Sequence, residues 1–385
     1  MTDPAFPSRP ASYDKQVGLV LQGGGAFGSY QAGVYEVLAE SDYQPDWVAG
    51  ISIGAINAAI IAGNAPADRV AKLRAFWDQV TAPTAAWPAA LPPSLASMQR
   101  QASAAASMIF GQPGFFAPRA PMQWFAKTQP TSWYETAALK STLERLVDFD
   151  RINARQTRLS VGAVNVRTGN FAYFDNAEIT IRPEHIMASG ALPPGFPAVE
   201  IDGEQYWDGG LVSNTPLQYM MEMLPRFSRI VFQVDLFSAR GQSPANIDEA
   251  ENRARDIRYS SRTRAVTDNF RRQHDIGHNI QLLWDRLPEE LRKLPEAQFL
   301  YHASCVTVMD IVQLIYRPTA AQGTSKGYEF GRPTMRARWA AGAADAIATL
   351  KAAPWLAPAR RQLGVRSFDV GLPRQHRADR PSHPC

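Results

Sequence analysis

Apolar and polar residues are patterned along positions 16–63 as strand, loop, helix, strand, sharp turn and helix. Positions 16–22 form an apolar run rich in Val and Leu, which predicts a buried strand. A glycine-rich loop follows, and apolar residues then recur at helical spacing. A second short strand is predicted at 47–49 and a helix at 55–61. The pattern thus predicts two adjacent strand–turn–helix junctions, around which the rest of the chain is organised.

The remaining chain alternates between strand and helix patterns. Short apolar runs predict strands, whereas apolar residues three and four apart predict helices. Strands are predicted at 158–166, 170–175, 199–201, 205–207, 229–236 and 305–316, and helices at 67–80, 133–149, 183–188, 216–224, 246–281, 282–299 and 331–350. This order favours an α/β fold, with a twisted, mostly parallel sheet between helices and a helical C-terminal addition.

Composition suggests where these units begin and end. Residues 1–15 contain several prolines and predict a flexible leader, and the main α/β unit is expected at 16–240. A mainly helical extension is expected at 241–356. Residues 357–385 hold six arginines and two aspartates, so this tail carries the whole net charge of +4. A solvated, disordered end is the first interpretation of the tail, and attraction to an anionic lipid surface is the alternative.

Residues 81–130 differ from their surroundings, because they are rich in Ala, Pro, Met and aromatic residues and poor in charge. Their Pro and Gly residues exclude one long helix. One interpretation is a cap packed on the main unit, and the other is the wall or lid of an acyl-binding cleft. The two are compatible, since a lid is a packed cap that moves. The pattern does not decide whether this segment moves.

The second junction carries a candidate nucleophile. The sequence Gly50-Ile51-Ser52-Ile53-Gly54 lies between the second strand and its helix, and it matches the nucleophile-elbow pattern Gly-x-Ser-x-Gly. Glycines on both sides of the serine leave room for a strained turn that lifts the hydroxyl out at the positive end of a helix. The alternative is an ordinary serine in a tight turn.

The glycine loop of the first junction has two interpretations. Its spacing fits the dinucleotide-binding fingerprint, but the second strand does not end in the acidic residue that would hold a ribose. The other interpretation is an oxyanion hole, in which backbone N–H groups stabilise the negative charge that develops on a carbonyl oxygen. The serine elbow favours this second interpretation. The loop residues are Gly23, Gly24, Gly25, Ala26, Phe27 and Gly28.

Together these motifs resemble the patatin-like phospholipase family. Gly-Gly-Gly-x-x-Gly precedes Gly-x-Ser-x-Gly by about 25 residues, and Asp208-Gly209-Gly210 followed by Asn214 resembles the family's downstream Asp-Gly-Gly motif. The run at 188–197 is also similar. The resemblance covers roughly 16–240, and 300–350 resembles a C-terminal extension of a bacterial subgroup. It implies a three-layer sandwich and a catalytic dyad of Ser52 and Asp208.

Two rival partners for Ser52 are Asp175 and a histidine. Asp175 ends a predicted hairpin strand without a following glycine turn, so Asp208 is preferred. A serine–acid–histidine triad needs a histidine after the acid, and His302 is the best of the six histidines for that place. The chain departs from the family at Phe27, where many members have Arg or Lys. This departure removes a positive side chain near the loop.

The sequence predicts neither a metal nor a cofactor, because its six histidines and two cysteines lack ligand spacing. No secretory signal and no membrane-spanning apolar run is apparent, so a cytoplasmic protein is expected, with contact at the inner membrane surface left open. Nucleic acid is disfavoured as a partner, since the basic tail lacks interleaved aromatic residues. The oligomeric state is not indicated.

The resulting hypothesis is a serine acyl hydrolase of lipid or other acyl esters, similar to a phospholipase A and acting through an acyl-serine. Two alternatives stay open. The same serine would also serve an acyltransferase or a thioesterase. A non-catalytic lipid-binding or regulatory protein would instead use the charged C-terminal helices as its partner surface.

Overall fold

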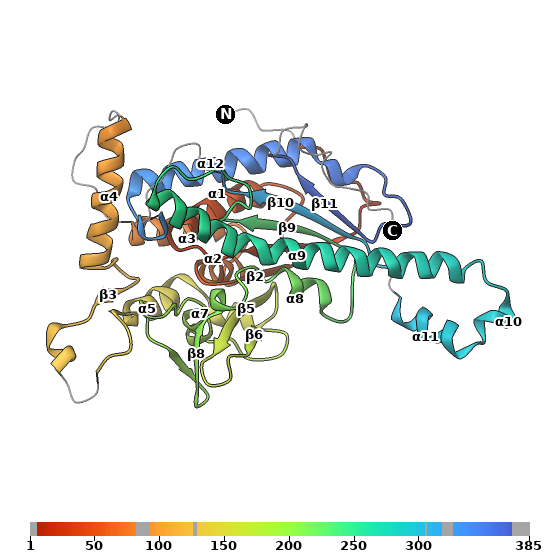
Figure 1. The fold of residues 1–385 in the computed structure, drawn as a ribbon, viewed down its shortest axis with the longest axis horizontal. Helices are drawn as coiled ribbons and strands as arrows, with labels where there is room; N and C mark the ends of the chain where they lie inside the picture. The colour runs from red at the N-terminus through yellow and green to blue at the C-terminus, as the bar shows by residue number, and fades with distance from the viewer. Residues whose placement is uncertain (1–5, 82–92, 126–128, 305, 318–325, 372–385) are drawn as a thin grey trace.

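The computed structural model describes residues 6–81, 93–125, 129–304, 306–317 and 326–371 (Figure 1). Its main sheet follows from the apolar runs seen in the sequence, which become buried strands. These strands are β1 (Gln16–Leu21), β2 (Trp47–Gly50), β5 (Arg158–Asn165), β6 (Phe171–Asp175), β7 (Val199–Ile201), β8 (Glu204–Asp208), β9 (Arg229–Asp235), β10 (Met309–Ile315) and β11 (Val365–Asp369). A separate pair is formed by β3 (Ala117–Pro118) and β4 (Tyr134–Glu135).

The helices lie between and after these strands. They are α1 (Gly28–Ala39), α2 (Ile53–Ala62), α3 (Arg69–Val80), α4 (Pro93–Phe110), α5 (Ala137–Leu146), α6 (Phe149–Asn153), α7 (Pro183–Ser189), α8 (Leu217–Glu222), α9 (Ile247–Trp284), α10 (Glu289–Arg292), α11 (Pro295–Ala303) and α12 (Arg332–Ala352). Short 3₁₀ turns occur at η1 (Gly25–Phe27), η2 (Pro121–Phe125), η3 (Gly209–Leu211), η4 (Lys326–Tyr328) and η5 (Pro354–Leu356). The helix expected at 282–299 is instead the end of α9 followed by the short α10 and α11.

The sheet is mostly parallel, as expected. Its order is β11-β10-β9-β1-β2-β5-β8-β7, and β6 pairs with β5 outside this path. All neighbours from β11 to β5 are parallel, whereas the pairs of β5 with β6, β5 with β8 and β7 with β8 are antiparallel. The parallel centre places the ends of β1 and β2, with their two junctions, side by side.

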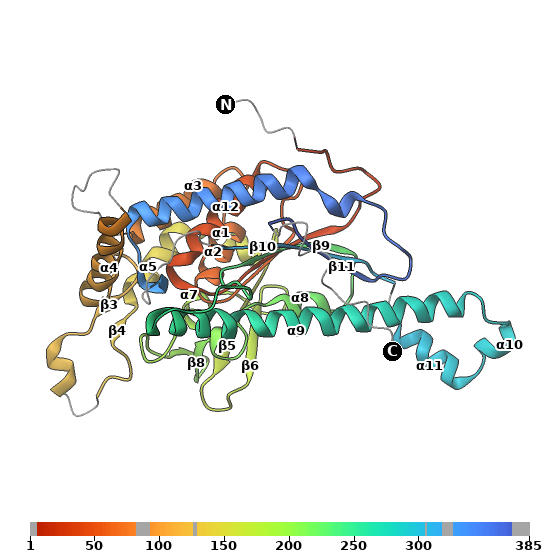
Figure 2. The same ribbon diagram turned by 45° about the horizontal axis from the view of Figure 1, so that its top comes forward.

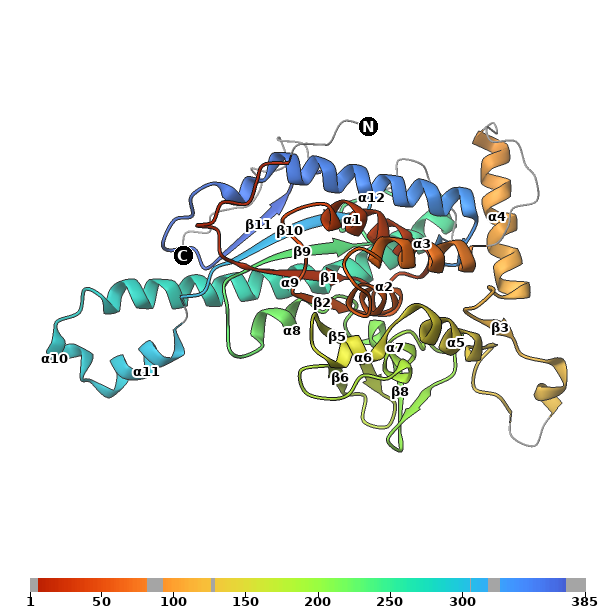
Figure 3. The same cartoon turned by 180° about the vertical axis from the view of Figure 1, so that it is seen from behind.

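Helices cover both faces of the sheet, which makes a three-layer α/β sandwich (Figure 2). Successive residues of β1 point to opposite faces. Leu19 and Leu21 therefore enter a core with α1, α2, α3 and α12, and Val20 enters a second core with α8 and α9. Figure 3 shows the first group of helices from the other side. Both faces of the central strands are thus buried, which explains their continuous apolar sequences.

The C-terminal extension is mainly helical, and it also lengthens the sheet with β10 and β11. The tail expected to be disordered from residue 357 is therefore ordered as far as residue 371. The cause is a buried charge cluster, in which Asp310 of β10 accepts hydrogen bonds from the guanidinium of Arg366 at 2.6 and 2.9 Å. Residues 372–385 lie outside the described chain.

The same cluster corrects the prediction of a flexible leader. Asp310 also accepts hydrogen bonds from the Tyr13 hydroxyl at 2.6 Å and from the Lys15 ammonium at 2.5 Å. Leader residues 6–15 are therefore held against the C-terminal strands, because a buried carboxylate needs cationic and hydrogen-bonding partners. Residues 1–5 lie outside the described chain.

Candidate active site

Ser52 lies where β2 passes into α2, as the elbow pattern predicts. Its φ of 55° and ψ of −125° are unusual for a residue with a side chain. The flanking glycines are required sterically. A Cβ on Gly50 would lie 2.2 Å from the carbonyl oxygen of Gly54, and a Cβ on Gly54 would lie 2.2 Å from that of Leu21. The turn thus fixes Ser52 at the N-terminus of α2, where the helix dipole favours negative charge.

Asp208 is the last residue of β8, and its pairing with Ala163 of β5 places it near Ser52. Its carboxylate accepts a hydrogen bond from the Gly210 amide at 2.7 Å. The side chain is almost fully buried. Burial raises the pKa of Asp208 to about 7, although the Gly210 amide and the nearby Ser52 hydroxyl act in the opposite direction. The motif glycine Gly209 is also constrained, because a Cβ there would lie 2.6 Å from the Gly162 carbonyl oxygen.

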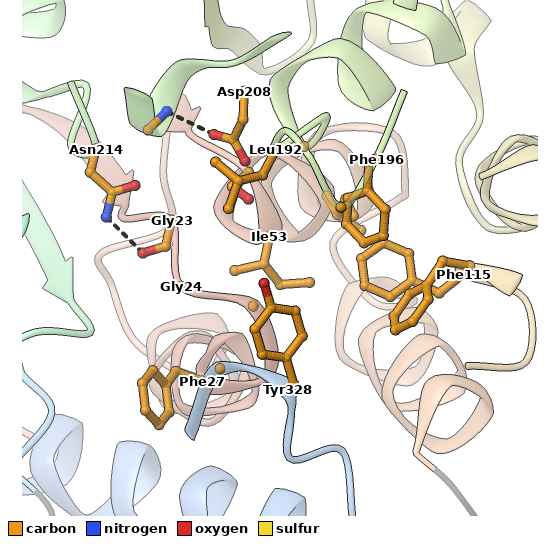
Figure 4. A pocket seen from close by; sticks show the side chains of 18 of the residues that line it. Gly23, Gly24, Phe27, Ile53, Phe115, Leu192, Phe196, Asp208, Asn214 and Tyr328 are labelled. Carbon is orange, nitrogen blue, oxygen red and sulfur yellow. Dashed lines mark hydrogen bonds between the residues drawn. The ribbon is translucent and has the colours of Figure 1, made fainter. Parts of the chain in front are cut away.

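The glycine loop lies beside this pair and is held by Asn214 (Figure 4). The Asn214 amide group donates to the Gly23 carbonyl at 2.8 Å, and the Gly23 N–H donates to the Asn214 carbonyl at 3.1 Å. A Cβ on Gly23 would lie 2.4 Å from the Asn214 side-chain oxygen and 3.0 Å from the Ser52 Cβ. Asn214 was noted in the sequence only as part of a motif, and its role in holding the loop was missed.

These and neighbouring hydrogen bonds reduce the number of loop amides that could serve as the predicted oxyanion hole. The amide of Gly23 is engaged by Asn214, that of Phe27 donates to the Gly24 carbonyl, and that of Gly28 to the Gly25 carbonyl. Neither Gly28 nor Ala26 lines the pocket. The amides of Gly24 and Gly25 have no acceptor within the part of the chain that the structure describes, so these two are the candidate donors to an oxyanion.

Ser52 and Asp208 face a mostly apolar pocket of about 230 Å³. Its aromatic walls come from segments far apart in the sequence. They include Phe27 of the glycine loop, Phe115, Phe116, Tyr134, Phe196, Phe237, Tyr259, Tyr328 and Phe330. Phe115 and Phe116 are buried and line this pocket, so they are the residues of the 81–130 segment that form part of its wall in the described chain. Residues 82–92 and 126–128 lie outside the described chain.

The C-terminal extension completes the pocket, which sequence reasoning did not foresee. Tyr259 and Arg255 of α9 and Tyr328 of η4 line it. The extension also supplies a cation behind the glycine loop. The guanidinium of Arg338 lies 4.7 Å from the centre of the Phe27 ring and donates to the Ala26 carbonyl at 3.1 Å. A cation therefore lies near Phe27 on another element, where it is paired with the buried Glu329 at 3.7 Å.

The rival partners of Ser52 lie elsewhere. Asp175 is buried against Arg158, and its carboxylate also accepts hydrogen bonds from the hydroxyls of Ser160 and Tyr219. His302 is exposed on α11, at the far end of the molecule from the pocket. Among the described residues, none that lines the pocket is a histidine.

Within the described ranges, no group of three or more His, Cys, Asp or Glu residues is placed to hold a metal ion. Among those same residues, no helix has the length and apolar character needed to cross a membrane.

Two solved structures are similar to the chain at low sequence identity. The chain is 17% identical to VipD from Legionella pneumophila, with a TM-score of 0.36, over 89% of this chain and 67% of that one. It is 19% identical to a chain of the ExoU–SpcU complex of the Pseudomonas aeruginosa type III secretion system, with a TM-score of 0.28. That match covers 68% of this chain and 52% of the other, so this chain spans about half of its length.

No curated protein matches the chain. Two family models do: one described as patatin-like phospholipase matches residues 19–221, and one described as patatin phospholipase matches residues 257–362. The first alone spans more than half of the 385 residues, including the glycine loop, Ser52 and Asp208. The chain therefore belongs to the patatin-like phospholipase family.

Proposed function

We propose that the chain is a serine acyl hydrolase of lipid esters, similar to a phospholipase A, in which Ser52 and Asp208 form the catalytic dyad. One observation carries the proposal: Ser52 at the elbow and the buried carboxylate of Asp208 face the same apolar pocket, close enough for the serine hydroxyl to favour the charged form of the carboxylate. A serine hydroxyl is a poor nucleophile unless a neighbouring base takes its proton. A carboxylate with a pKa near 7 is a suitable base at neutral pH.

In the first half of the reaction, the Ser52 oxygen attacks the ester carbonyl carbon while Asp208 takes the hydroxyl proton. The amides of Gly24 and Gly25 donate hydrogen bonds to the resulting oxyanion. The N-terminus of α2, where Ser52 lies, also favours this negative charge. When the carbon–oxygen bond to the alcohol breaks, Asp208 gives the proton to the leaving oxygen. The acyl group is then esterified to Ser52.

In the second half, a water molecule takes the place of the alcohol. Asp208 takes a proton from this water while the water oxygen attacks the acyl carbon, and a second tetrahedral intermediate forms. Its collapse returns the proton to the Ser52 oxygen and releases the fatty acid. The aromatic walls favour an acyl chain in the pocket, because its transfer from water removes apolar surface from solvent.

Labelling with a fluorophosphonate probe tests the proposal. The wild-type protein should be labelled, and Ser52→Ala should abolish labelling. Ser213→Ala is the matched control, because Ser213 lies in the loop next to Asn214 and its hydroxyl bonds only weakly, at 3.4 Å, to the Thr215 carbonyl. Labelling that survives in Ser52→Ala, or a wild-type protein that stays unlabelled beside a reactive control esterase, would refute the assignment.

The reaction products distinguish a hydrolase from an acyltransferase that uses the same serine. With a short-chain ester in water, the proposed activity releases free fatty acid at the same rate when other alcohols or thiols are added. If these acceptors instead capture most of the acyl group, the protein is a transferase. A silent protein that binds lipid without turnover would count against both.

A further inference from the structure

One segment beside the pocket exposes a cluster of large apolar side chains. We call residues 108–125 and 129–134 the apolar lobe. Six of its large apolar side chains are exposed, with exposed fractions from 43% for Met108 to 85% for Phe125. They are Met108, Ile109, Phe110, Met122, Phe125 and Trp133. A soluble surface rarely gathers so many large apolar side chains unless it binds something.

The charge of this region is one-sided. No Asp or Glu occurs between Asp78 and Glu135, whereas Arg100, Arg119 and Lys127 lie in that interval. A stretch of more than fifty residues without a carboxylate is unusual in a chain in which one residue in five is charged. Apolar side chains together with basic ones, and without acidic ones, match the interface of a bilayer that contains anionic lipids.

The lobe is continuous with the pocket wall. Its inner side carries Phe115 and Phe116, which are buried and line the pocket. The N–H groups of Trp133 and Tyr134 donate to the carbonyls of Pro194 and Gly195, each at 3.0 Å, and Gly195 lines the pocket too. One segment therefore presents aromatic residues to the pocket on its inner side and to solvent on its outer side.

The lobe is also an extension of the molecule rather than part of its core. In Figures 1 and 2, α4, β3 and η2 project from the end of the molecule at which α9 begins. The Tyr134 hydroxyl ties this projection together by donating to the Met108 carbonyl at 2.6 Å, and the rings of Trp124 and Trp133 lie 5.5 Å apart. A projecting apolar surface of this kind can enter a bilayer without moving the sheet.

We propose that the apolar lobe docks the protein on the surface of a lipid bilayer that contains anionic lipids. The exposed apolar side chains enter the acyl region of the bilayer. Docking brings the pocket mouth to the bilayer, so that an acyl chain passes from lipid to pocket along an apolar wall. Docking is a property separate from the proposed hydrolysis, because the lobe can bind lipid without any catalytic turnover.

Flotation with vesicles of phosphatidylcholine and phosphatidylglycerol tests the proposal. Wild type and Ser52→Ala should float equally, because docking does not depend on the nucleophile. A lobe variant carries Phe110→Ser, Met122→Ser and Phe125→Ser, none of which lines the pocket. Its vesicle affinity should fall by roughly tenfold for each large side chain that no longer enters the bilayer. Its thermal unfolding midpoint and its hydrolysis of a soluble short-chain ester should match the wild type.

The control variant changes three exposed apolar residues at the opposite end of the molecule, on and beside α10 and α11. It carries Leu291→Ser, Leu294→Ser and Phe299→Ser. This variant should float like the wild type. Equal losses in both variants, or no loss in the lobe variant, would overturn the proposal. So would a lobe-dependent dimer in light scattering together with a wild type that does not float. Absent esterase activity with intact flotation would reject only the proposed hydrolysis.

Discussion

Replacing Asp208 with Asn should make the protein more stable while removing its activity. The carboxylate is almost fully buried, and its pKa in the folded protein is about 7, against 3.8 in an exposed aspartate. An Asn oxygen can still accept the hydrogen bond from the Gly210 amide, which spans 2.7 Å in the wild type. The substitution therefore removes a charge that burial disfavours and keeps the main backbone contact.

The size of the effect follows from the two pKa values. Between about pH 4 and pH 7 the folded protein holds a proton on Asp208 that the unfolded chain has released, so the free energy of unfolding falls as the pH rises through this range. A difference of about three pKa units corresponds to about 4 kcal/mol, which is the upper limit of the gain expected for Asp208→Asn at pH 8. At pH 4 the two proteins should be almost equally stable.

Urea unfolding at pH 4, 6 and 8, followed by tryptophan fluorescence, measures this dependence, and hydrolysis of a soluble ester measures activity. Asp208→Asn should lower kcat/KM by at least about a hundredfold, because the amide cannot accept a proton. The wild-type kcat/KM should rise through about pH 7 as Asp208 ionises.

Asp235 is the matched control, since burial also raises its pKa to about 7 and it does not line the pocket. Asp235→Asn should become more stable over the same pH range and keep its activity. The reasoning fails if Asp208→Asn is no more stable than the wild type at pH 8, or if its stability depends on pH as steeply as that of the wild type.

Two further predictions concern contacts that hold the site and the fold. Asn214→Ala leaves the Gly23 carbonyl without its side-chain donor, so stability should drop by about 1–3 kcal/mol and kcat should fall more than KM rises; an unchanged kcat in steady-state assays would argue against a role in holding the loop. Asp310→Ala removes the buried carboxylate that pairs with the partly buried Arg366, which should destabilise the protein by about 3–5 kcal/mol in urea unfolding, whereas a loss below about 1 kcal/mol would mean that the cluster contributes little.

The sequence alone predicted the residues whose backbone requirements are local. A glycine on each side of Ser52 and a glycine pair after Asp208 are demanded by turns only a few residues long, and such turns leave a readable motif. The fold class was predictable for a related reason. The central strands are buried on both faces, so their apolar runs stand out against the helices that separate them.

Contacts between distant segments left no such signal. The sequence of α9 is rich in charged residues of both signs, so its pattern indicated a solvated helix, although Tyr259 reaches the pocket. The strand β11 was hidden for a similar reason, because Arg366 reads as part of a basic tail until Asp310 is known to lie beside it. A residue that serves as the partner of a group fifty positions away cannot be recognised from its own neighbourhood.

The place of the C-terminal extension in the pocket has a consequence for synthesis. Ser52, Asp208 and the glycine loop leave the ribosome early, whereas Tyr328 and Phe330, which close the pocket, are made more than a hundred residues after Asp208. During translation the nucleophile and its base therefore exist before the aromatic wall that encloses them. The full apolar pocket forms only after residue 330 has been made, so an acyl chain can be enclosed only after the nucleophile and its base have already been synthesised.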